Sequence, residues 1–307
     1  MTHNDHPVPE LKTLMTGLVI GESPRWHEGR LWFCHWGASE IIAVDLRGNS
    51  EVVTRDPGTS PHSIEWLPDG RQLIVPANPE RTERLLRREP DGSQVAHADL
   101  SGLPSGFNEI VVDGRGNIYG NGAAFDFMAF LEGVQRDGED AQQVPWRERA
   151  GFVPGFIALI TPDGAARVVA DGIAFPNGMA VTPDNATLII SESFAGRLTA
   201  FDIAADGSLS NRRVWADGLG PDGICIDAEG AVWTSTGGNA CVRVREGGEV
   251  LQRIELDRGP FACMLGGPDR RTLFIMAAEW NPENPFGGPR TGQVLIAPAP
   301  APGVGWP

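Results

Sequence analysis

Apolar and polar residues alternate along this chain in short runs, and turn residues separate the runs. In residues 220–230, Ile224 and Ile226 are apolar at a spacing of two, and a Glu229-Gly230 turn follows them. Alternation with a period of two predicts β-strands rather than helices. No long stretch shows the 3.6-residue period that the crossover helices of a parallel sheet require.

The same pattern occurs six times. Each copy starts at a residue that aligns with Asp222 and reaches a turn seven or eight residues later. The six aligned residues are Glu22, His62, Asn108, Asn177, Asp222 and Ala262. Further apolar runs give four short strands per copy and a repeat of roughly 40–47 residues, which is typical of a propeller blade. The sequence therefore predicts an all-β fold: one six-bladed β-propeller with four-stranded antiparallel blades over residues 11–297.

Two parts of the chain depart from the repeat. The sixth copy has only three strands, and we expect residues 11–14 to supply its outer strand, since that pairing leaves no open edge. Asn108 and Asn177 are 69 residues apart because of an insertion at about residues 122–155, whose apolar part includes Phe125. We expect this insertion to form a lid with a short helix over one mouth of the channel. Packing against a neighbouring blade or a second subunit is the alternative.

Composition mainly excludes partners. The formal net charge of −15 argues against nucleic acids, which call for a basic surface. Neither a long apolar run nor a signal-peptide pattern is found, so we expect a cytoplasmic protein without a membrane partner. The four cysteines lie in expected strands and indicate buried reduced thiols, although a disulfide between Cys225 and Cys263 is left open. We expect residues 1–10 and 298–307 to be flexible tails, and the protein to be a monomer or a homodimer.

The aligned residues indicate a metal site. The innermost strands of a propeller start at one mouth of its channel, so these residues should face one another there. Each alone is compatible with an ordinary turn, but their shared position in the repeat favours a common role. Two buried carboxylates are costly without a cation. Carboxylate and amide oxygens suit Ca²⁺ or Mg²⁺, and Mn²⁺, better than an ion that prefers thiolates.

Three motifs resemble the senescence marker protein / gluconolactonase / luciferin-regenerating enzyme family. They are Gly21-Glu22-Ser23-Pro24-Arg25-Trp26, Phe175-Pro176-Asn177-Gly178-Met179 and Pro221-Asp222-Gly223-Ile224-Cys225-Ile226-Asp227. The resemblance covers about residues 11–297. It implies a six-bladed propeller with one divalent metal ion in its channel and hydrolysis of lactones. By motif position, it implies that Glu22, Asn177 and Asp222 are metal ligands, that Asn108 is the fourth polar group, and that Asp222 is catalytic. Ca²⁺ is the expected ion, with Zn²⁺, Mg²⁺, Mn²⁺ and Fe²⁺ as alternatives.

Departures from the family pattern bear on the substrate. Gly106 stands where sugar-lactonase members often carry Arg, Glu109 stands where Asp is usual, and His62 replaces a small residue. The candidate substrate-binding residues are Asn108, His62, Glu109 and Phe125. The missing Arg and the apolar insertion favour a small-molecule lactone more hydrophobic than a simple sugar lactone. A phosphotriesterase or arylesterase and a non-catalytic calcium-binding propeller are the alternatives, and the sequence does not decide whether Asp222 is a general base or a nucleophile.

Overall fold

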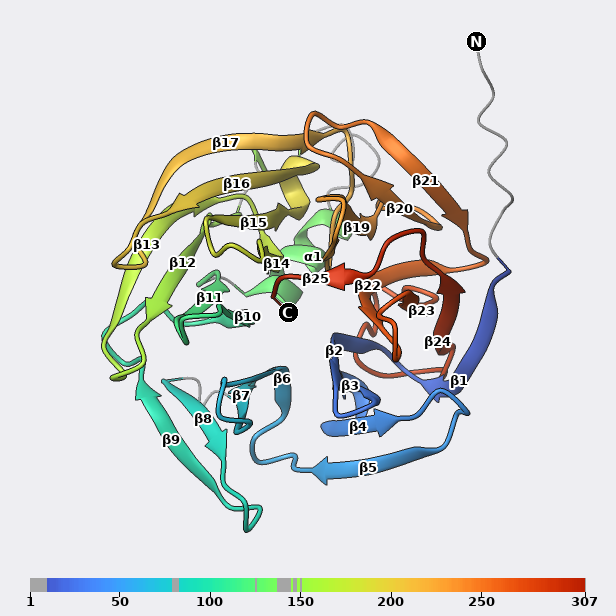
Figure 1. Cartoon of the computed structure of the whole chain (residues 1–307), viewed down its shortest axis with the longest axis horizontal. Helices are drawn as coiled ribbons and strands as arrows, with labels where there is room; N and C mark the ends of the chain where they lie inside the picture. The colour runs from blue at the N-terminus through green and yellow to red at the C-terminus, as the bar shows by residue number, and fades with distance from the viewer. Residues whose placement is uncertain are drawn as a thin grey trace.

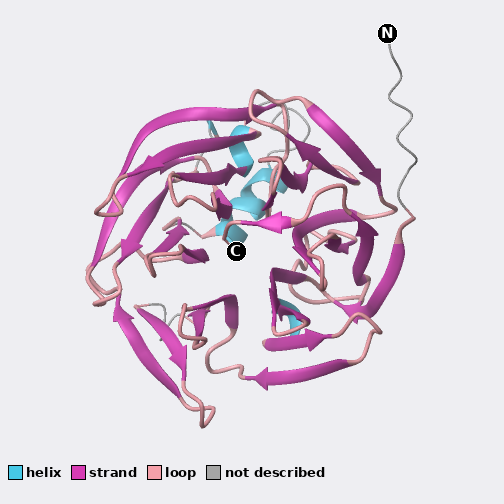
Figure 2. Cartoon of the chain, viewed as in Figure 1, coloured by secondary structure: helices cyan, strands magenta, loops and turns pink. Residues whose placement is uncertain are grey.

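The computed structural model describes residues 10–78, 83–124, 126–136, 145, 148–149 and 151–306. Six sheets surround a central axis as the blades of a propeller (Figure 1). Figure 2 shows how little of the ring is helical, the main helix being α1 (Phe127–Arg136) in the third blade. The predicted all-β, six-bladed architecture with antiparallel blades is confirmed.

Each blade is an antiparallel meander that runs outward from the channel. The first contains β2 (Gly21–His27), β3 (Arg30–His35), β4 (Glu40–Val44) and β5 (Ser50–Arg55). The second contains β6 (Pro61–Trp66), β7 (Gln72–Pro76), β8 (Arg84–Arg88) and β9 (Gln94–Asp99). The third contains β10 (Phe107–Val112), β11 (Ile118–Gly122), β12 (Gly155–Ile160) and β13 (Ala166–Ile173). The fourth contains β14 (Pro176–Val181), β15 (Thr187–Glu192), β16 (Arg197–Ile203) and β17 (Leu209–Asp217). The fifth contains β18 (Cys225–Asp227), β19 (Val232–Ser235), β20 (Ala240–Val244) and β21 (Val250–Glu255). The sixth contains β22 (Gly259–Gly266), β23 (Thr272–Ala278) and β24 (Gly292–Pro298).

The N-terminal strand closes the ring. β1 (Lys12–Leu18) pairs antiparallel with β24, with Lys12 opposite Ile296 and Thr13 opposite Leu295. It is thus the outer strand of the sixth blade, as the sequence predicted. The first and last parts of the chain share one sheet, which removes the exposed edge that β24 would otherwise present.

The C-terminal segment is also built into the sheets, although we expected residues 298–307 to be a flexible tail. β25 (Gly303–Val304) adds a fifth strand to the fifth blade by pairing with Ile226 and Asp227 of β18. Trp306 then exchanges two backbone hydrogen bonds with Val181 of β14, 2.8 and 3.0 Å long. Figure 1 shows β25 and the C-terminus near the centre of the ring. The inner edges of these strands offer unpaired backbone groups, and the C-terminal segment satisfies them.

The apolar core lies between neighbouring blades. Blades are stacked face to face, so an inner strand such as β23 is buried along nearly its whole length instead of on alternate residues. Phe33, Trp233 and Phe274 are fully buried in the cluster that joins the first, fifth and sixth blades. Burial of side chains of this size contributes about 1.5–3 kcal/mol each. The innermost strands are therefore firmly held at the channel.

The cysteines are free and buried. The Sγ atoms of Cys225 and Cys263 lie 3.9 Å apart, well beyond the length of about 2 Å of a disulfide bond. The disulfide that the sequence left open is thus not formed in this structure. Within the described ranges, none of the helices has the length and apolar content needed to span a membrane.

Candidate active site

The structure brings the aligned polar residues together at one mouth of the channel. Glu22, His62, Asn108 and Asn177 are each the second residue of an innermost strand, and Asp222 lies three residues before β18, the innermost strand of the fifth blade. Nε2 of His62 lies 3.0 Å from Oδ1 of Asn108, and Nδ2 of Asn108 lies 3.5 Å from Oδ1 of Asn177. The sixth blade contributes only Ala262, which is buried. We refer to Glu22, His62, Asn108, Asn177 and Asp222 as the polar ring.

Backbone irregularities turn these side chains towards the channel. The pairing of β6, β10 and β14 with their neighbours shifts register across His62, Asn108 and Asn177, respectively. A similar shift follows Glu22 in β2. A β-bulge interrupts the regular alternation of a strand and can re-aim a side chain, which explains its frequent occurrence beside active sites. The bulges therefore allow the polar-ring residues, which lie at the starts of innermost strands, to face the central axis of the propeller.

The surroundings of the polar ring raise the pKa values of its two carboxyl groups. Burial, and then the charges of Asp222 and Glu109, raise the pKa of Glu22 well above its ordinary value. Burial, and then the charge of Glu109, raise the pKa of Asp222 to about 7. Close negative charges in a poorly hydrated channel favour protonation, unless a cation compensates them.

The polar ring fits a divalent metal ion. Oδ1 of Asp222 is buried and accepts no hydrogen bond from any residue that the structure describes. A carboxylate oxygen left in this state costs free energy that an ion would restore. Within the described ranges, no group of three or more His, Cys, Asp and Glu side chains could hold a metal ion. The predicted set is of another kind, because two of its four donors, Asn108 and Asn177, are amides, which are ligands typical of Ca²⁺.

His62 is held as a neutral donor to Asn108. Trp36 of the 3-10 helix η1 (Trp36–Ala38) stacks on the imidazole at 4.0 Å and donates from Nε1 to the His62 carbonyl. Burial lowers the pKa of His62, although the hydrogen bond to Asn108 opposes this effect. The amide of Asn108 is thereby oriented, since its Nδ2 donates to the Pro176 carbonyl at 3.2 Å. The Asn108 oxygen retains a second lone pair for another partner.

Glu109 lies in a buried network beside the polar ring. Its Oε1 accepts hydrogen bonds from Nη2 of Arg25 at 2.8 Å, from Oγ of Ser63 at 2.5 Å and from Oγ of Ser23 at 3.1 Å. Nε of Arg25 donates to Glu65 at 2.7 Å. The contacts found for this candidate substrate-binding residue are thus with protein groups, which position it. The sequence interpretation missed Arg25, although it stands three residues after Glu22 in the first motif.

The position of the family's Arg cannot carry a side chain in this backbone. Gly106 has φ of +82°, and a Cβ there would collide with the carbonyl oxygen of Ala123. Gly122 and Gly155 are similarly crowded by the carbonyls of Gly106 and Gly122, respectively. Only glycine allows three backbone segments to approach this closely. Gly106 therefore stands in place of Arg because the backbone of the insertion passes too close for any side chain at this position.

The described part of the insertion packs on the fourth blade. Phe127 and Phe130 of α1 lie 5.2 Å from Phe175 and 5.7 Å from Phe194, respectively. Phe175 and Phe194 stack on each other at 4.2 Å, and Phe152 completes this aromatic cluster. The predicted short helix is confirmed, and Figure 1 shows it reaching towards the centre of the ring. Phe125, the remaining substrate-binding candidate, lies outside the described residues.

This chain is similar to known proteins over most of its length. Regucalcin from Xenopus laevis is 30% identical over 88% of this chain and 88% of its own length. Pentonolactonase XacC from Haloferax volcanii is 25% identical over 86% of this chain and 83% of its own length. A solved structure of a luciferin-regenerating enzyme has a TM-score of 0.76 and covers 97% of this chain and 98% of its own; at 17% identity it shows the fold alone.

The sequence profile of the SMP-30/Gluconolactonase/LRE-like region matches residues 20–279, which extend from just before Glu22 to the end of the second strand of the sixth blade. All members of the polar ring lie within this range. The chain therefore belongs to the SMP-30/gluconolactonase/LRE-like family.

Proposed function

We propose that this protein is a metal-dependent hydrolase that opens a lactone. The observation that carries the proposal is the buried, unpartnered Oδ1 of Asp222 within a ring of oxygen donors. The similarity to a pentonolactonase supports lactones as the substrate class. The substrate is a small molecule, and neither nucleic acid nor membrane is needed.

The metal would be held by Glu22, Asn108, Asn177 and Asp222. Ca²⁺ suits four oxygen donors best, and Mg²⁺, Mn²⁺, Zn²⁺ and Fe²⁺ are the other ions to test. A bound divalent ion would polarise the ester carbonyl and stabilise the charge that develops on its oxygen.

The chain's own groups supply proton transfer and orientation. Asp222 accepts a proton from water as the water oxygen bonds to the lactone carbonyl carbon. The ring C–O bond then breaks, and the proton passes from Asp222 to the departing alkoxide oxygen, so that the carboxylate is restored. Asn108, which His62 orients, contacts the substrate. Direct attack by Asp222 is the alternative, in which a covalent acyl intermediate is hydrolysed.

Asp222→Asn tests the proposal. General acid–base catalysis typically contributes about 10²–10⁴-fold, so we expect kcat/KM on a lactone panel to fall by at least about 10²-fold. The exposed Asp171→Asn is the matched control and should retain activity, and chelation of the metal should abolish it. Full turnover by Asp222→Asn would disprove a catalytic role for Asp222.

Three further measurements separate the alternatives. Arylesters and phosphotriesters belong in the same panel, and preference for one of them would replace the lactone assignment. Calcium binding without turnover of any ester would identify a non-catalytic propeller. In a single turnover in ¹⁸O-water, label in Asp222 would show direct attack and would exclude simple general-base catalysis.

A further inference from the structure

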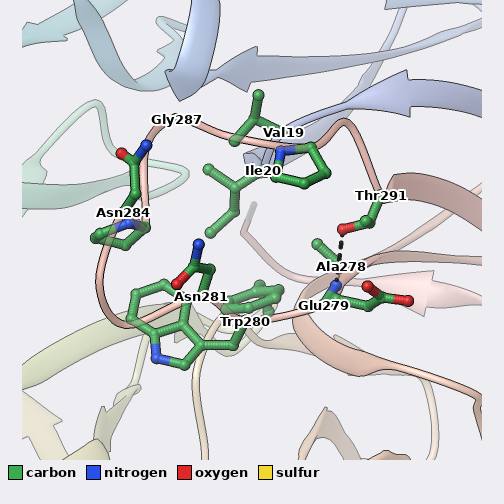
Figure 3. Close-up of a pocket in the computed structure, with 12 residues that line it drawn as sticks. Val19, Ile20, Ala278, Glu279, Trp280, Asn281, Asn284, Gly287 and Thr291 are labelled. Carbon is green, nitrogen blue, oxygen red and sulfur yellow. Dashed lines mark hydrogen bonds between the residues drawn. The ribbon is translucent and has the colours of Figure 1, made fainter.

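A cavity of about 200 Å³ lies beside the polar ring, at the connection between β23 and β24. This connection, residues 279–291, is referred to as the 279–291 loop. Figure 3 shows the cavity between Ile20, Trp280, Asn281 and Asn284. Since a water molecule takes about 30 Å³ in the liquid, the space holds on the order of six non-hydrogen atoms.

Two residues of the cavity wall connect it with the segments that carry Glu22 and Asp222. Ile20, in its wall, is two residues before Glu22. Phe261, also in its wall, accepts a backbone hydrogen bond of 2.8 Å from Gly223, the residue after Asp222. The blade between these two is the sixth, whose aligned residue is Ala262. The cavity thus lies over the one blade that brings no polar donor to the ring.

The 279–291 loop also touches the side of the ring that holds His62. Phe286 packs against Trp36 at 5.8 Å, and Trp36 stacks on His62. Trp280 contacts Phe261 at 5.8 Å. These contacts anchor the loop on the first and sixth blades, next to the position that the reacting ester would take.

Internal hydrogen bonds preform the loop. The backbone N–H of Glu279 donates to Oγ1 of Thr291 at 3.1 Å, the dashed line in Figure 3. The N–H groups of Asn284 and Gly287 donate to the carbonyls of Asn281 and Asn284 at 3.2 and 3.3 Å. Ligand sites are usually largely preformed in this way. Trp280 remains 42% exposed and Phe286 39% exposed, so the preformed loop presents apolar surface to an incoming group.

The lining disfavours an anionic group. Ile20, Phe261 and Trp280 provide an apolar wall, and the amides of Asn281 and Asn284 provide donors and acceptors. No Lys or Arg lines the cavity, and Figure 3 shows the Glu279 carboxylate on the side away from Asn281 and Asn284. An anionic group would meet no cation here and would lie close to Glu22 and Asp222. A mostly apolar group that carries one hydrogen-bonding function would satisfy both walls.

We propose that this cavity binds a neutral, mainly apolar substituent of the lactone while the ester lies at the polar ring. The inference rests on the proposed lactonase function and specifies its substrate class. It assigns Trp280 as a specificity-determining residue, with Asn284 contributing hydrogen bonds. It also moves the site of substrate selection from the insertion of the third blade to the opposite side of the mouth.

The test compares two lactones with the same five-membered ring, one unsubstituted and one with a neutral alkylamide group of about six non-hydrogen atoms. The wild-type protein, loaded with Ca²⁺, should prefer the substituted lactone in kcat/KM. Trp280→Ala should reduce this preference by about tenfold, in the range known for lost apolar contacts in a pocket, and leave the unsubstituted lactone unaffected. Asn284→Leu should weaken the alkylamide substrate but not one with a plain alkyl group of equal length.

Trp306→Ala is the matched control, because Trp306 is similarly exposed, at 38%, but lies with β25 away from the polar ring. Thermal unfolding of each variant verifies folding. Equal preference in wild type, Trp280→Ala and Trp306→Ala would overturn the cavity assignment and leave the lactonase function intact. If neither lactone is hydrolysed, the proposed function fails, and the inference fails with it.

Discussion

The second and third strands of a blade are joined at the mouth of the channel, and two of these connections differ sharply. In the third blade the connection is the insertion between β11 and β12, and in the sixth it is the 279–291 loop. These blades lie opposite each other in the ring (Figure 1). The insertion buries Phe130 against Phe194, whereas the 279–291 loop leaves Trp280 and Phe286 exposed, and Trp280 lines a cavity.

The difference shows that apolar content alone does not identify a binding wall. The sequence suggested a hydrophobic substrate because the insertion is rich in aromatic residues. In the structure, Phe127 and Phe130 pack on the fourth blade and stabilise the insertion itself. Trp280 and Phe286, which are exposed, belong to a loop that the sequence interpretation did not single out. Only apolar side chains that stay exposed after a segment has packed on the rest of the protein can contribute to a binding surface.

The largest expected effect on stability comes from a substitution in the polar ring. Both connections can act on a substrate only if the polar ring is intact. Glu22→Gln should abolish stabilisation by Ca²⁺, which is about 2.7 kcal/mol for a site at one hundred times its Kd. Thermal unfolding with and without Ca²⁺ measures this, with the exposed Glu51→Gln as control. Undiminished stabilisation of Glu22→Gln would remove Glu22 from the ligand set.

The same measurement at several pH values sharpens the result. Since the pKa of Asp222 is raised to about 7 and that of Glu22 is raised as well, the metal-free fold binds their protons more tightly than the unfolded chain does. The contribution of Glu22 and Asp222 to its free energy of unfolding should therefore fall as the pH rises from about 4 to about 7. Ca²⁺ should reduce this fall, so the difference between loaded and metal-free protein should widen with pH. A constant difference would contradict the assignment.

Glycine substitutions in the two connections should have unequal effects. Gly106 and Gly288 both have positive φ, +82° and +88°, so alanine costs about 1–2 kcal/mol of backbone strain at either position. A Cβ at Gly106 also collides with Ala123, whereas at Gly288 it meets only amide nitrogens 3.9 Å away. We therefore expect Gly106→Ala to lower the free energy of unfolding in urea by more than Gly288→Ala does. Equal losses would show that the insertion adapts without cost.

The last comparison concerns packing, and its smallest expected effect is at Phe286. Phe194 lies at the centre of the aromatic cluster and is partly buried, so Phe194→Ala should cost about 1–3 kcal/mol and speed proteolysis within the insertion. Phe286→Ala, from a side chain 39% exposed, should cost less than about 1 kcal/mol. Similar losses of stability in the two variants would remove the distinction between the connections.

The sequence predicted the ring because its residues share a position in a repeat. Glu22, Asn108, Asn177 and Asp222 were identifiable by alignment of the copies with one another. The bulges that re-aim His62 and Asn108 were not, because a register shift depends on the partner strand. Arg25 was overlooked because its ion pairs with Glu65 and Glu109 join three blades that are far apart in the chain.

The cavity and the crowding at Gly106 were equally inaccessible from the sequence. The 279–291 loop differs in length from the corresponding connections of the other blades, so alignment of the copies could not reveal what its residues enclose. Gly106 was visible as a departure from the family pattern, but its cause is the path of the insertion's backbone beside it. Packing between segments that are distant in sequence decides both features.

The strand β25 has a practical consequence for handling the protein. It pairs at Ile226 and Asp227, the end of β18 that is farther along the chain from Asp222, and Trp306 then joins it to the fourth blade. A linker attached after Trp306 would be anchored to two blades and would start away from the polar ring. Molecules coupled to a solid support through such a linker should share one orientation, with the substrate entrance facing the solution.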